Sequence, residues 1–213
     1  MKRLVWLSVI VILSATVAAA QSSGSFNFSS DQTACTDTGG LLGTGSTQTA
    51  LKTTMKVSSG SGVALVIRPS AVVGLLTNVS LTKTGLASSQ AGVNFDVTVT
   101  PLSGQQNPVV TPNMPVTYDD RYISISTNIF DAIATQCSVI SGGCYFNFNE
   151  TTLSAHSFDW VVTNLSSGNY GITVTWTPYT TYQAPNNAQT CVGPIMLTAT
   201  QTKIFNQSTG ISF

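Results

Sequence analysis

Ser154, His156, Ser157 and Asp159 place the residue types of a hydrolytic triad within six positions. Nucleophilic catalysis requires a hydroxyl, an imidazole and a carboxylate that converge in space. Side chains alternate between the two faces of a strand, so Ser154 and His156 would share one face, and Ser157 and Asp159 the other. No G-x-S-x-G nucleophile elbow occurs. The sequence therefore favours a structural role for His156 and a chain without catalytic residues, with a secreted hydrolase as an alternative.

The acidic residues are scattered, and only Asp119 and Asp120 are adjacent. Together with Asn113 and Asn149 they could supply oxygen ligands to calcium, although no EF-hand or repeated loop accompanies them. The segment Asp119–Arg121 is instead expected at a turn or bulge between strands, where the arginine balances the charge locally. No P-loop, dinucleotide fingerprint or haem-attachment motif is present. The sequence thus predicts neither a metal nor a cofactor.

Aromatic rings in the last third of the chain could stack on the flat faces of sugars. Trp160 and Trp176 alternate with Val and Thr, which predicts that both lie in the core. Tyr179 and Tyr182 follow Pro178 in a polar segment, so we expect them to form an exposed pair in a loop. A carbohydrate-binding module that holds a polysaccharide through Tyr179 and Tyr182 is therefore one alternative function.

The first twenty residues have the pattern of an export signal. Met1–Arg3 is basic, Leu4–Leu13 is almost wholly apolar, and Ala18–Ala20 supplies small residues before Gln21. This order is typical of a secretory signal peptide, and the apolar stretch is shorter than the roughly 20 residues that span a bilayer. We expect residues 1–20 to be removed, with no stable membrane insertion afterwards. The mature chain would then be secreted to the periplasm, the cell surface or the extracellular space.

The four cysteines are even in number, and disulfides persist in exported proteins. A Gly-Gly turn between Cys137 and Cys144 favours a local bridge between these two. Cys35 and Cys191 would then join the beginning of the fold to its end, which stabilises it by about 5 kcal/mol in the chain-entropy model. Zinc is the competing use of cysteine, but no C-x-x-C occurs and His156 is the only histidine. Two structural disulfides are therefore predicted.

Charged residues make up only 8% of the 213 residues, eight basic and eight acidic, so the formal net charge is zero. An ordinary soluble domain carries about 25% charged residues. The few basic residues form no patch that would attract nucleic acid or an anionic membrane. The apolar fraction of 42% nevertheless suffices for a core. The composition therefore argues against nucleic acid as a partner and favours a compact domain with a polar, uncharged surface.

Most of the chain has the pattern of strands. Apolar and polar residues alternate in Val93–Val99, Phe158–Val162 and Tyr170–Trp176, which is typical of half-buried antiparallel strands. Further strands are expected at Val63–Ile67, Val72–Thr82, Pro115–Thr127, Tyr145–Phe148 and Met196–Phe205. Only Thr127–Thr135 has helical spacing, with Thr127 or Asn128 as its cap. About eight strands and one short helix predict an all-β antiparallel sandwich.

The segment Leu165–Trp176, Leu-Ser-Ser-Gly-Asn-Tyr-Gly-Ile-Thr-Val-Thr-Trp, resembles one strand entry of immunoglobulin-like and fibronectin-III-like β-sandwiches, with the pattern L-x-x-G-x-Y-x-V-x-V. The resemblance implies an immunoglobulin-like architecture, a corner formed by Tyr170, and a closing strand at Met196–Phe205. The antibody pattern is incomplete, since no Cys lies two residues after Tyr170. Leu153–Trp160 and Cys191–Phe205 also resemble stretches of exported bacterial proteins of no assigned function, which implies no chemistry.

Residues 35–213 are expected to form a single β-sandwich domain behind a polar leader, residues 21–34. Phe26 and Phe28 lie two positions apart in this leader, so both rings would point to the same side of a strand. The segment is then a first strand or flexible leader, or a donor strand that completes the sheet of a neighbouring copy. Self-association through Phe26 and Phe28 is the partner hypothesis that follows.

These features predict a secreted, non-catalytic β-sandwich that acts as a structural or binding module at a surface or in a matrix. An outer-membrane β-barrel is a further alternative, because the strands alternate and the chain ends in Ile211–Phe213 with a terminal phenylalanine. Strands of such a barrel should be about ten residues long and flanked by aromatic girdles. The short predicted strands and the loop closed by cysteines fit this alternative poorly.

Overall fold

The computed structural model describes residues 26–37, 43–44, 47–58, 60, 62–81, 87–125, 128, 146–182 and 187–203. Several predictions concern other parts of the chain. The signal peptide over residues 1–20, the Cys137–Cys144 bridge, the helix over Thr127–Thr135 (apart from Asn128) and the terminal Ile211–Phe213 lie outside the described residues. They remain predictions.

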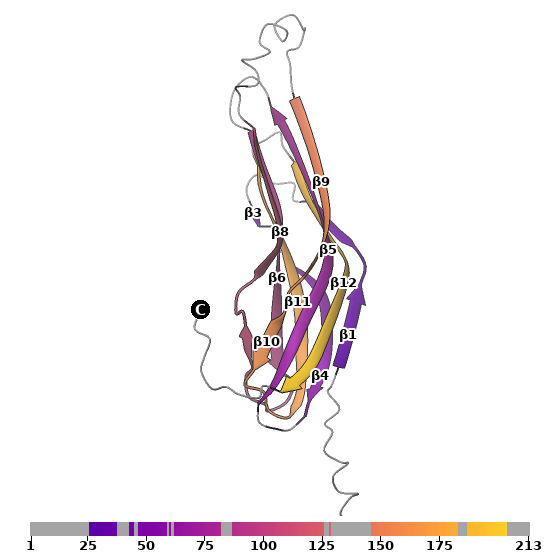
Figure 1. The fold of residues 1–213 in the computed structure, drawn as a ribbon, viewed down its shortest axis with the longest axis vertical. Coiled ribbons are helices and arrows are strands. Elements are labelled where there is room, and N and C mark those ends of the chain that lie inside the picture. The colour runs from indigo at the N-terminus through magenta and orange to yellow at the C-terminus, as the bar shows by residue number, and fades with distance from the viewer. Residues whose placement is uncertain are drawn as a thin grey trace, which may run out of the picture.

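The described residues form strands that run along the long axis of the molecule (Figure 1). These are β1 (Phe26–Asp31), β2 (Ala34–Asp37), β3 (Gly43–Thr44), β4 (Gln48–Val57), β5 (Val63–Leu81), β6 (Ala87–Pro101), β7 (Val109–Thr111), β8 (Val116–Ile125), β9 (Phe146–Ser157), β10 (Trp160–Thr163), β11 (Gly168–Tyr182) and β12 (Asn187–Lys203). A seven-stranded sheet has the order β1-β12-β5-β10-β7, with β2 also beside β12 and β9 also beside β5. A five-stranded sheet has the order β3-β11-β6-β8, with β4 also beside β11. All of these pairings are antiparallel.

The pairing of the strands is nested like that of a rolled hairpin. Some of the strands are interrupted. Both β1 and β2 lie along β12, both β3 and β4 lie along β11, and both β9 and β10 lie along β5, so each of these pairs acts as one interrupted strand. The eight resulting strands then pair first with eighth, second with seventh, third with sixth and fourth with fifth. This is the order of a jelly roll, with β7 as a short addition beside β10.

The predicted all-β antiparallel architecture is therefore confirmed, but the immunoglobulin-like strand order is wrong for this chain. An immunoglobulin-like sandwich has the order A-B-E-D in one sheet and C-F-G in the other. The segment Leu165–Trp176 carried the resemblance, and such a local pattern does not determine which distant strands pair.

One hydrophobic core lies between the two sheets and contains side chains from both. Its largest fully buried side chains are Trp160, Trp176, Tyr170, Phe95, Leu65, Ile67, Leu75, Ile172, Leu197, Val57 and Val73. Burial of a single side chain of this size contributes about 1.5 to 3 kcal/mol. Period-two alternation predicted the inward face of β6 and β11 correctly, and Trp160 and Trp176 are core residues as predicted. Phe158, predicted to share the face of Trp160, is 41% exposed because β9 ends at Ser157 and β10 begins at Trp160.

Tyr170 fixes the loop that precedes β11. Its hydroxyl accepts a hydrogen bond from the backbone N–H of Ser166 at 3.0 Å and lies 3.2 Å from the carbonyl oxygen of Ser166, to which it donates. The ring itself is fully buried. The tyrosine corner implied by the sequence resemblance is therefore present, within a different overall strand order.

The first strand closes one side of the sandwich. Residues Phe26–Asp31 form β1, the first of the two structures expected for this segment, and it lies at the edge of the seven-stranded sheet (Figure 1). The Asn27 amide nitrogen donates to the carbonyl oxygen of Thr54 at 2.6 Å and to Thr53 Oγ1 at 2.9 Å, both on β4. The Asn27 side chain thus ties the edges of the two sheets together.

Where β12 passes from β2 to β1, its backbone is irregular. The register with β5 shifts between Val192 and Ile195. Gly193 has a φ of 133°, and a Cβ atom there would lie 2.8 Å from both the carbonyl oxygen of Gln32 and the nitrogen of Thr33. The close approach of two backbones therefore requires glycine at this position.

We predict that Gly193→Ala destabilises the protein by at least about 3 kcal/mol, because it combines a strained φ with a collision against backbone. Gly104→Ala is the matched control, since Gly104 also has a positive φ, 55°, but a Cβ there meets nothing within 4 Å. It should cost about 1 kcal/mol. Urea unfolding of both variants measures the difference. Equal losses would show that the approach between Gly193 and the β1–β2 connection is not tight.

Candidate functional site

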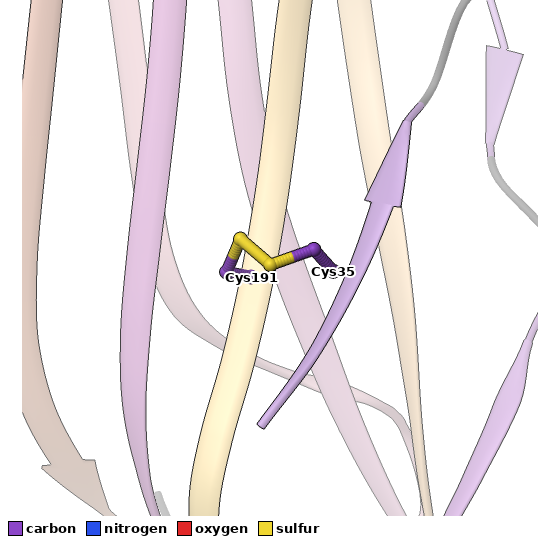
Figure 2. The surroundings of a disulfide bond; sticks show 2 residues. All are labelled: Cys35 and Cys191. Atoms are coloured by element: carbon purple, nitrogen blue, oxygen red, sulfur yellow. A yellow bond between two sulfur atoms is a disulfide. The ribbon is translucent and has the colours of Figure 1, made fainter.

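Cys35 on β2 and Cys191 on β12 form a disulfide with an S–S distance of 2.08 Å (Figure 2). The two residues are directly opposite each other in the antiparallel register. The predicted pairing of these cysteines is confirmed. The bridge spans a sequence separation of 156 residues, and a loop of that length corresponds to about 5 kcal/mol of lost denatured-state entropy. A disulfide is consistent with an oxidising, non-cytoplasmic compartment.

A serine, a histidine and an aspartate do converge, but the aspartate is not the one close in sequence. Ser154 and His156 lie on β9, at one edge of the seven-stranded sheet, and Asp119 lies on β8, at the edge of the five-stranded sheet. The Ser154 hydroxyl donates to Asp119 Oδ2 at 2.6 Å, and Ser154 Oγ lies 2.7 Å from His156 Nε2. His156 Nε2 is 3.6 Å from Asp119 Oδ2. We call these three residues the β8–β9 clasp.

A β-bulge in β8 turns Asp119 toward the other sheet. The register with β6 shifts so that Asp119 lies opposite Val93 and Thr117 opposite Asn94, which leaves Tyr118 as the extra residue. Tyr118 is buried, and its hydroxyl donates to the carbonyl oxygen of Pro69 at 2.8 Å. Burial raises the pKa of Tyr118 well above its ordinary value. The sequence prediction placed Asp119–Arg121 at a turn or bulge between strands; the segment instead lies within β8, directly after a bulge at Tyr118, and Arg121 does not balance its neighbours but donates to the carbonyl oxygen of Leu75.

The direction of the hydrogen bonds argues against catalysis by the β8–β9 clasp. The Ser154 hydroxyl has one proton, and the carboxylate of Asp119 can only accept it. Ser154 Oγ must then accept from His156 Nε2, which carries a proton and cannot act as the base for that hydroxyl. In a Ser-His-Asp triad the imidazole lies between the other two groups. Here the serine lies between them, which is the arrangement of a structural bridge between two sheet edges.

The other residues considered for chemistry do not join the β8–β9 clasp. Asp120 lies opposite Gly92 and accepts from the Gln90 amide at 2.9 Å. Glu150 is exposed on β9. Asp159 pairs with Arg68 at 2.5 Å and 2.6 Å, and this hydrogen bonding lowers the pKa of Asp159 despite partial burial. Within the described ranges, no three His, Cys, Asp or Glu side chains gather closely enough to hold a metal ion.

Tyr179 lies on β11 and not in a loop, which corrects the sequence prediction for the pair Tyr179 and Tyr182. Pro178 suggested a loop, yet it is accommodated in the strand because β4 pairs only as far as Trp176 and β3 begins opposite Tyr179. Tyr182 ends β11, and its side chain lies outside the described part of the structure. The two tyrosines are therefore not an exposed loop pair.

The ring of Tyr179 packs directly on Gly92, its partner across the β6–β11 pair. A Cβ atom at Gly92 would lie 2.8 Å from Tyr179 Cε1, so the absence of a side chain makes room for the ring. Burial, then the negative charge of Asp120, raises the pKa of Tyr179 to about 12. Tyr179 thus lies on the outer face of the five-stranded sheet, between carboxylate, amide and hydroxyl groups.

The outer face of the seven-stranded sheet carries a protrusion and a depression. Phe26 and Phe28 are 61% and 63% exposed, and their ring centroids are 6.5 Å apart; we call this pair the Phe knob. Beside it lies a hollow of about 760 Å³, which we call the β12 hollow. It is lined by Ser30, Asp31, Gln32, Ser70, Ala71, Val72, Ala155, His156, Pro194, Ile195 and Met196. Small side chains on adjacent strands and the irregular backbone of β12 account for the depression.

Comparisons with known proteins supply no family for this chain. No protein-family model and no curated protein matches it. Among solved structures, the structure of the Gx strain of infectious bursal disease virus shows 9% identity over 84% of this chain and 41% of that chain, with a TM-score of 0.23. The VP2 subviral particle of the same virus shows 12% identity over 86% and 42%, with a TM-score of 0.16. The chain spans less than half the length of these proteins, and TM-scores this low support no argument.

Among the described residues, no helix has the length and apolar character needed to cross a membrane.

We predict that Ser154→Ala lowers the free energy of unfolding by about 1 to 3 kcal/mol, because it removes the group that both Asp119 and His156 contact. Ser157→Ala is the control, since Ser157 is exposed on the same strand; its effect should stay within about 0.5 kcal/mol. Chemical denaturation measures both. A wild-type esterase activity that Ser154→Ala abolishes without loss of stability would contradict the structural role of the β8–β9 clasp.

Proposed function

We propose that the chain is a secreted, non-catalytic structural module of a cell surface or extracellular matrix, and that it associates with other copies of itself through the outer face of the seven-stranded sheet. The observation that carries the proposal is the presence of the Phe knob and the β12 hollow on this one face. The signal-like pattern of residues 1–20 and the Cys35–Cys191 bridge support secretion.

The strand register supports the placement of both features on one face. Phe28 lies opposite Thr198, and Met196 lies opposite both Ser30 and Ser70. Directly opposed residues share a face, and these positions alternate with buried residues of β12 such as Leu197. Phe28, in the Phe knob, and Met196, in the lining of the β12 hollow, therefore both point away from the core, whereas Ala71 and Ile195 of the same lining are buried.

A face with one knob and one hollow is complementary to a second copy of itself. A two-fold axis that lies in the interface, midway between the two features, places the knob of each copy over the hollow of the other. An apolar cavity of about 150 Å³ accommodates one benzene ring. A hollow of about 760 Å³ has room for both phenyl rings of the knob.

Charge and area also favour a second copy as the partner. On this sheet the charges of Arg68 and Asp159 neutralise each other within each copy, through two hydrogen bonds of 2.5 Å and 2.6 Å. Four adjacent strands are about 19 Å wide, and residues 66–76 of β5 extend about 33 Å. The face thus offers about 600 Å², comparable to the roughly 800 Å² that each partner of a standard interface buries.

Association through the sheet face is favoured over association through the edge of β1. The backbone N–H of Phe28 donates to Asn27 Oδ1 at 2.8 Å, and that of Gln32 donates to Asp31 Oδ1 at 2.7 Å. These side chains occupy donors that an added strand would need, which is a common protection of sheet edges. The donor-strand form of the self-association hypothesis is therefore the less favoured form.

A complementation experiment tests the proposal. Phe26→Thr/Phe28→Thr removes the knob, and Ala155→Trp fills the hollow. Each variant alone should raise the dimer dissociation constant at least tenfold, because a buried aromatic anchor contributes about 2 kcal/mol or more. An equimolar mixture of the two should associate better than either, since the mixed dimer keeps one intact knob-and-hollow contact. Sedimentation equilibrium measures all three samples.

The matched control is Leu102→Thr/Met114→Thr, which removes two apolar side chains of similar exposure, 53% and 61%, outside this face. It should associate like the wild type. A wild-type protein that is monomeric at millimolar concentration, or a mixture no tighter than its components, would contradict the proposal.

Carbohydrate binding is a second candidate, and the position of Tyr179 favours it. A half-exposed ring beside Asp120, Gln90 and Thr117 combines a stacking surface with hydrogen-bonding groups on the outer face of the five-stranded sheet. If this face binds a polysaccharide, Tyr179→Ala should abolish retention in affinity electrophoresis, and Tyr179→Phe should weaken it several-fold. Lack of retention of the wild type on a panel of soluble and insoluble polysaccharides would exclude this candidate.

A further inference from the structure

The end of the sandwich that holds the β5–β9 pair has a polar interior. Thr77 on β5, Ser89 on β6 and Thr180 on β11 are each at least 97% buried. Their hydroxyl oxygens are inaccessible to solvent and have no hydrogen-bond partner among the described residues. Buried polar groups in folded proteins are almost always paired, with protein, ordered water or a bound ion. Three orphaned hydroxyls from three strands therefore indicate a bound species.

The register shows that these hydroxyls face the space between the sheets. Thr77 lies two positions from each of the buried residues Leu75 and Val79 on β5 and so shares their inward face. Ser89 lies two positions before Ala91 on β6, and Ala91 lies opposite Thr180 on β11. Residues two positions apart on a strand share a face. All three side chains thus point inward, one from the seven-stranded sheet and two from the five-stranded sheet.

Arg121 reaches into the same region. It lies opposite Ala91 on β8, so Arg121, Ala91 and Thr180 form one inward row across the five-stranded sheet. The guanidinium crosses to the other sheet, where Nη1 donates to the carbonyl oxygen of Leu75 at 3.2 Å. Leu75 is two positions from Thr77 on β5. The other terminal nitrogen, Nη2, is buried and has no hydrogen-bond partner in the part of the chain that the structure describes.

The charge of Arg121 has no counter-ion among the described residues. The carboxylate on the same inward side of β8, Asp119, accepts the Ser154 hydroxyl and lies 3.6 Å from His156. Asp120 faces the outside of the sheet. The Arg121 side chain is half-buried, and its Nη2 atom is inaccessible to solvent. An anion at this nitrogen would both accept its hydrogen bond and neutralise the charge, whereas water would only accept the hydrogen bond.

We propose that the interior of the sandwich holds a small monovalent anion of the size of chloride, bound by Arg121 Nη2 and the hydroxyls of Thr77, Ser89 and Thr180. All four groups can donate a hydrogen bond, and a guanidinium is always charged. Two residues beside them are buried alanines, Ala91 opposite Arg121 and Ala188 opposite Thr77, and their small side chains leave more room between the sheets than larger residues would. The anion would complete the core of this end of the sandwich, and its binding is independent of the sheet-face association proposed above.

Thermal unfolding in sodium chloride against sodium gluconate, at constant ionic strength, tests the anion site. Binding to the native state alone should raise the Tm of the wild type by roughly 3 to 5 °C for each tenfold increase in chloride above the dissociation constant. Arg121→Met should abolish this dependence. Arg68→Met is the matched control, because Arg68 is exposed and paired with Asp159; its chloride dependence should equal that of the wild type.

Two further measurements keep the test decisive. If Arg121→Met does not fold, Arg121→Lys retains a charge but loses the planar guanidinium, and its chloride dependence should be weakened. Anomalous diffraction from crystals grown in bromide should show a peak between Arg121 and Thr77. A wild-type Tm that does not respond to chloride, or density for water without an anomalous peak, would overturn the proposal. Neither result bears on the association of the Phe knob with the β12 hollow.

Discussion

The extra residue in β8 is the local feature on which the packing of the two sheets depends. Because the bulge places Tyr118 and Asp119 in succession on the inner side of the strand, one joins the core and the other reaches the opposite sheet. The Tyr118 ring stacks on Phe95 at a centroid distance of 4.1 Å and lies 6.3 Å from Trp160. A regular strand would turn one of the two toward solvent and would lose either the aromatic stack or the β8–β9 clasp.

Charged residues are scarce, and four of them make specific contacts. Arg68 and Asp159 neutralise each other on the outer face, Asp119 closes a sheet edge, and Arg121 crosses the interior. Surface ion pairs contribute little to stability in general, about 0 to 1 kcal/mol. The fold therefore relies on the apolar core and the disulfide, and the polar contacts determine where the sheets meet.

The sequence predicted those features that depend on neighbouring residues. Period-two alternation located the buried face of β6 and β11, and the segment before Tyr170 indicated the tyrosine corner. The strand order was not predictable, because it depends on pairings such as β1 with β12 that no local pattern encodes. The same reason explains why Asp119, 35 residues from Ser154, was not recognised as its partner. The expected turn or bulge between strands at Asp119–Arg121 gave no indication of this pair, because the segment lies within β8.

The jelly-roll order explains why the disulfide and the proposed contact surface occur together. Nested pairing makes the first and last strands neighbours, so β1 and β2 both lie along β12. Terminal strands fray most easily, and Cys35 fixes the connection that follows β1 to the centre of the sheet at Cys191. The bridge therefore holds the Phe knob in register with the wall of the β12 hollow. This face combines the first and the last strands that the structure describes, and the Cys35–Cys191 bond supplies a covalent constraint between them.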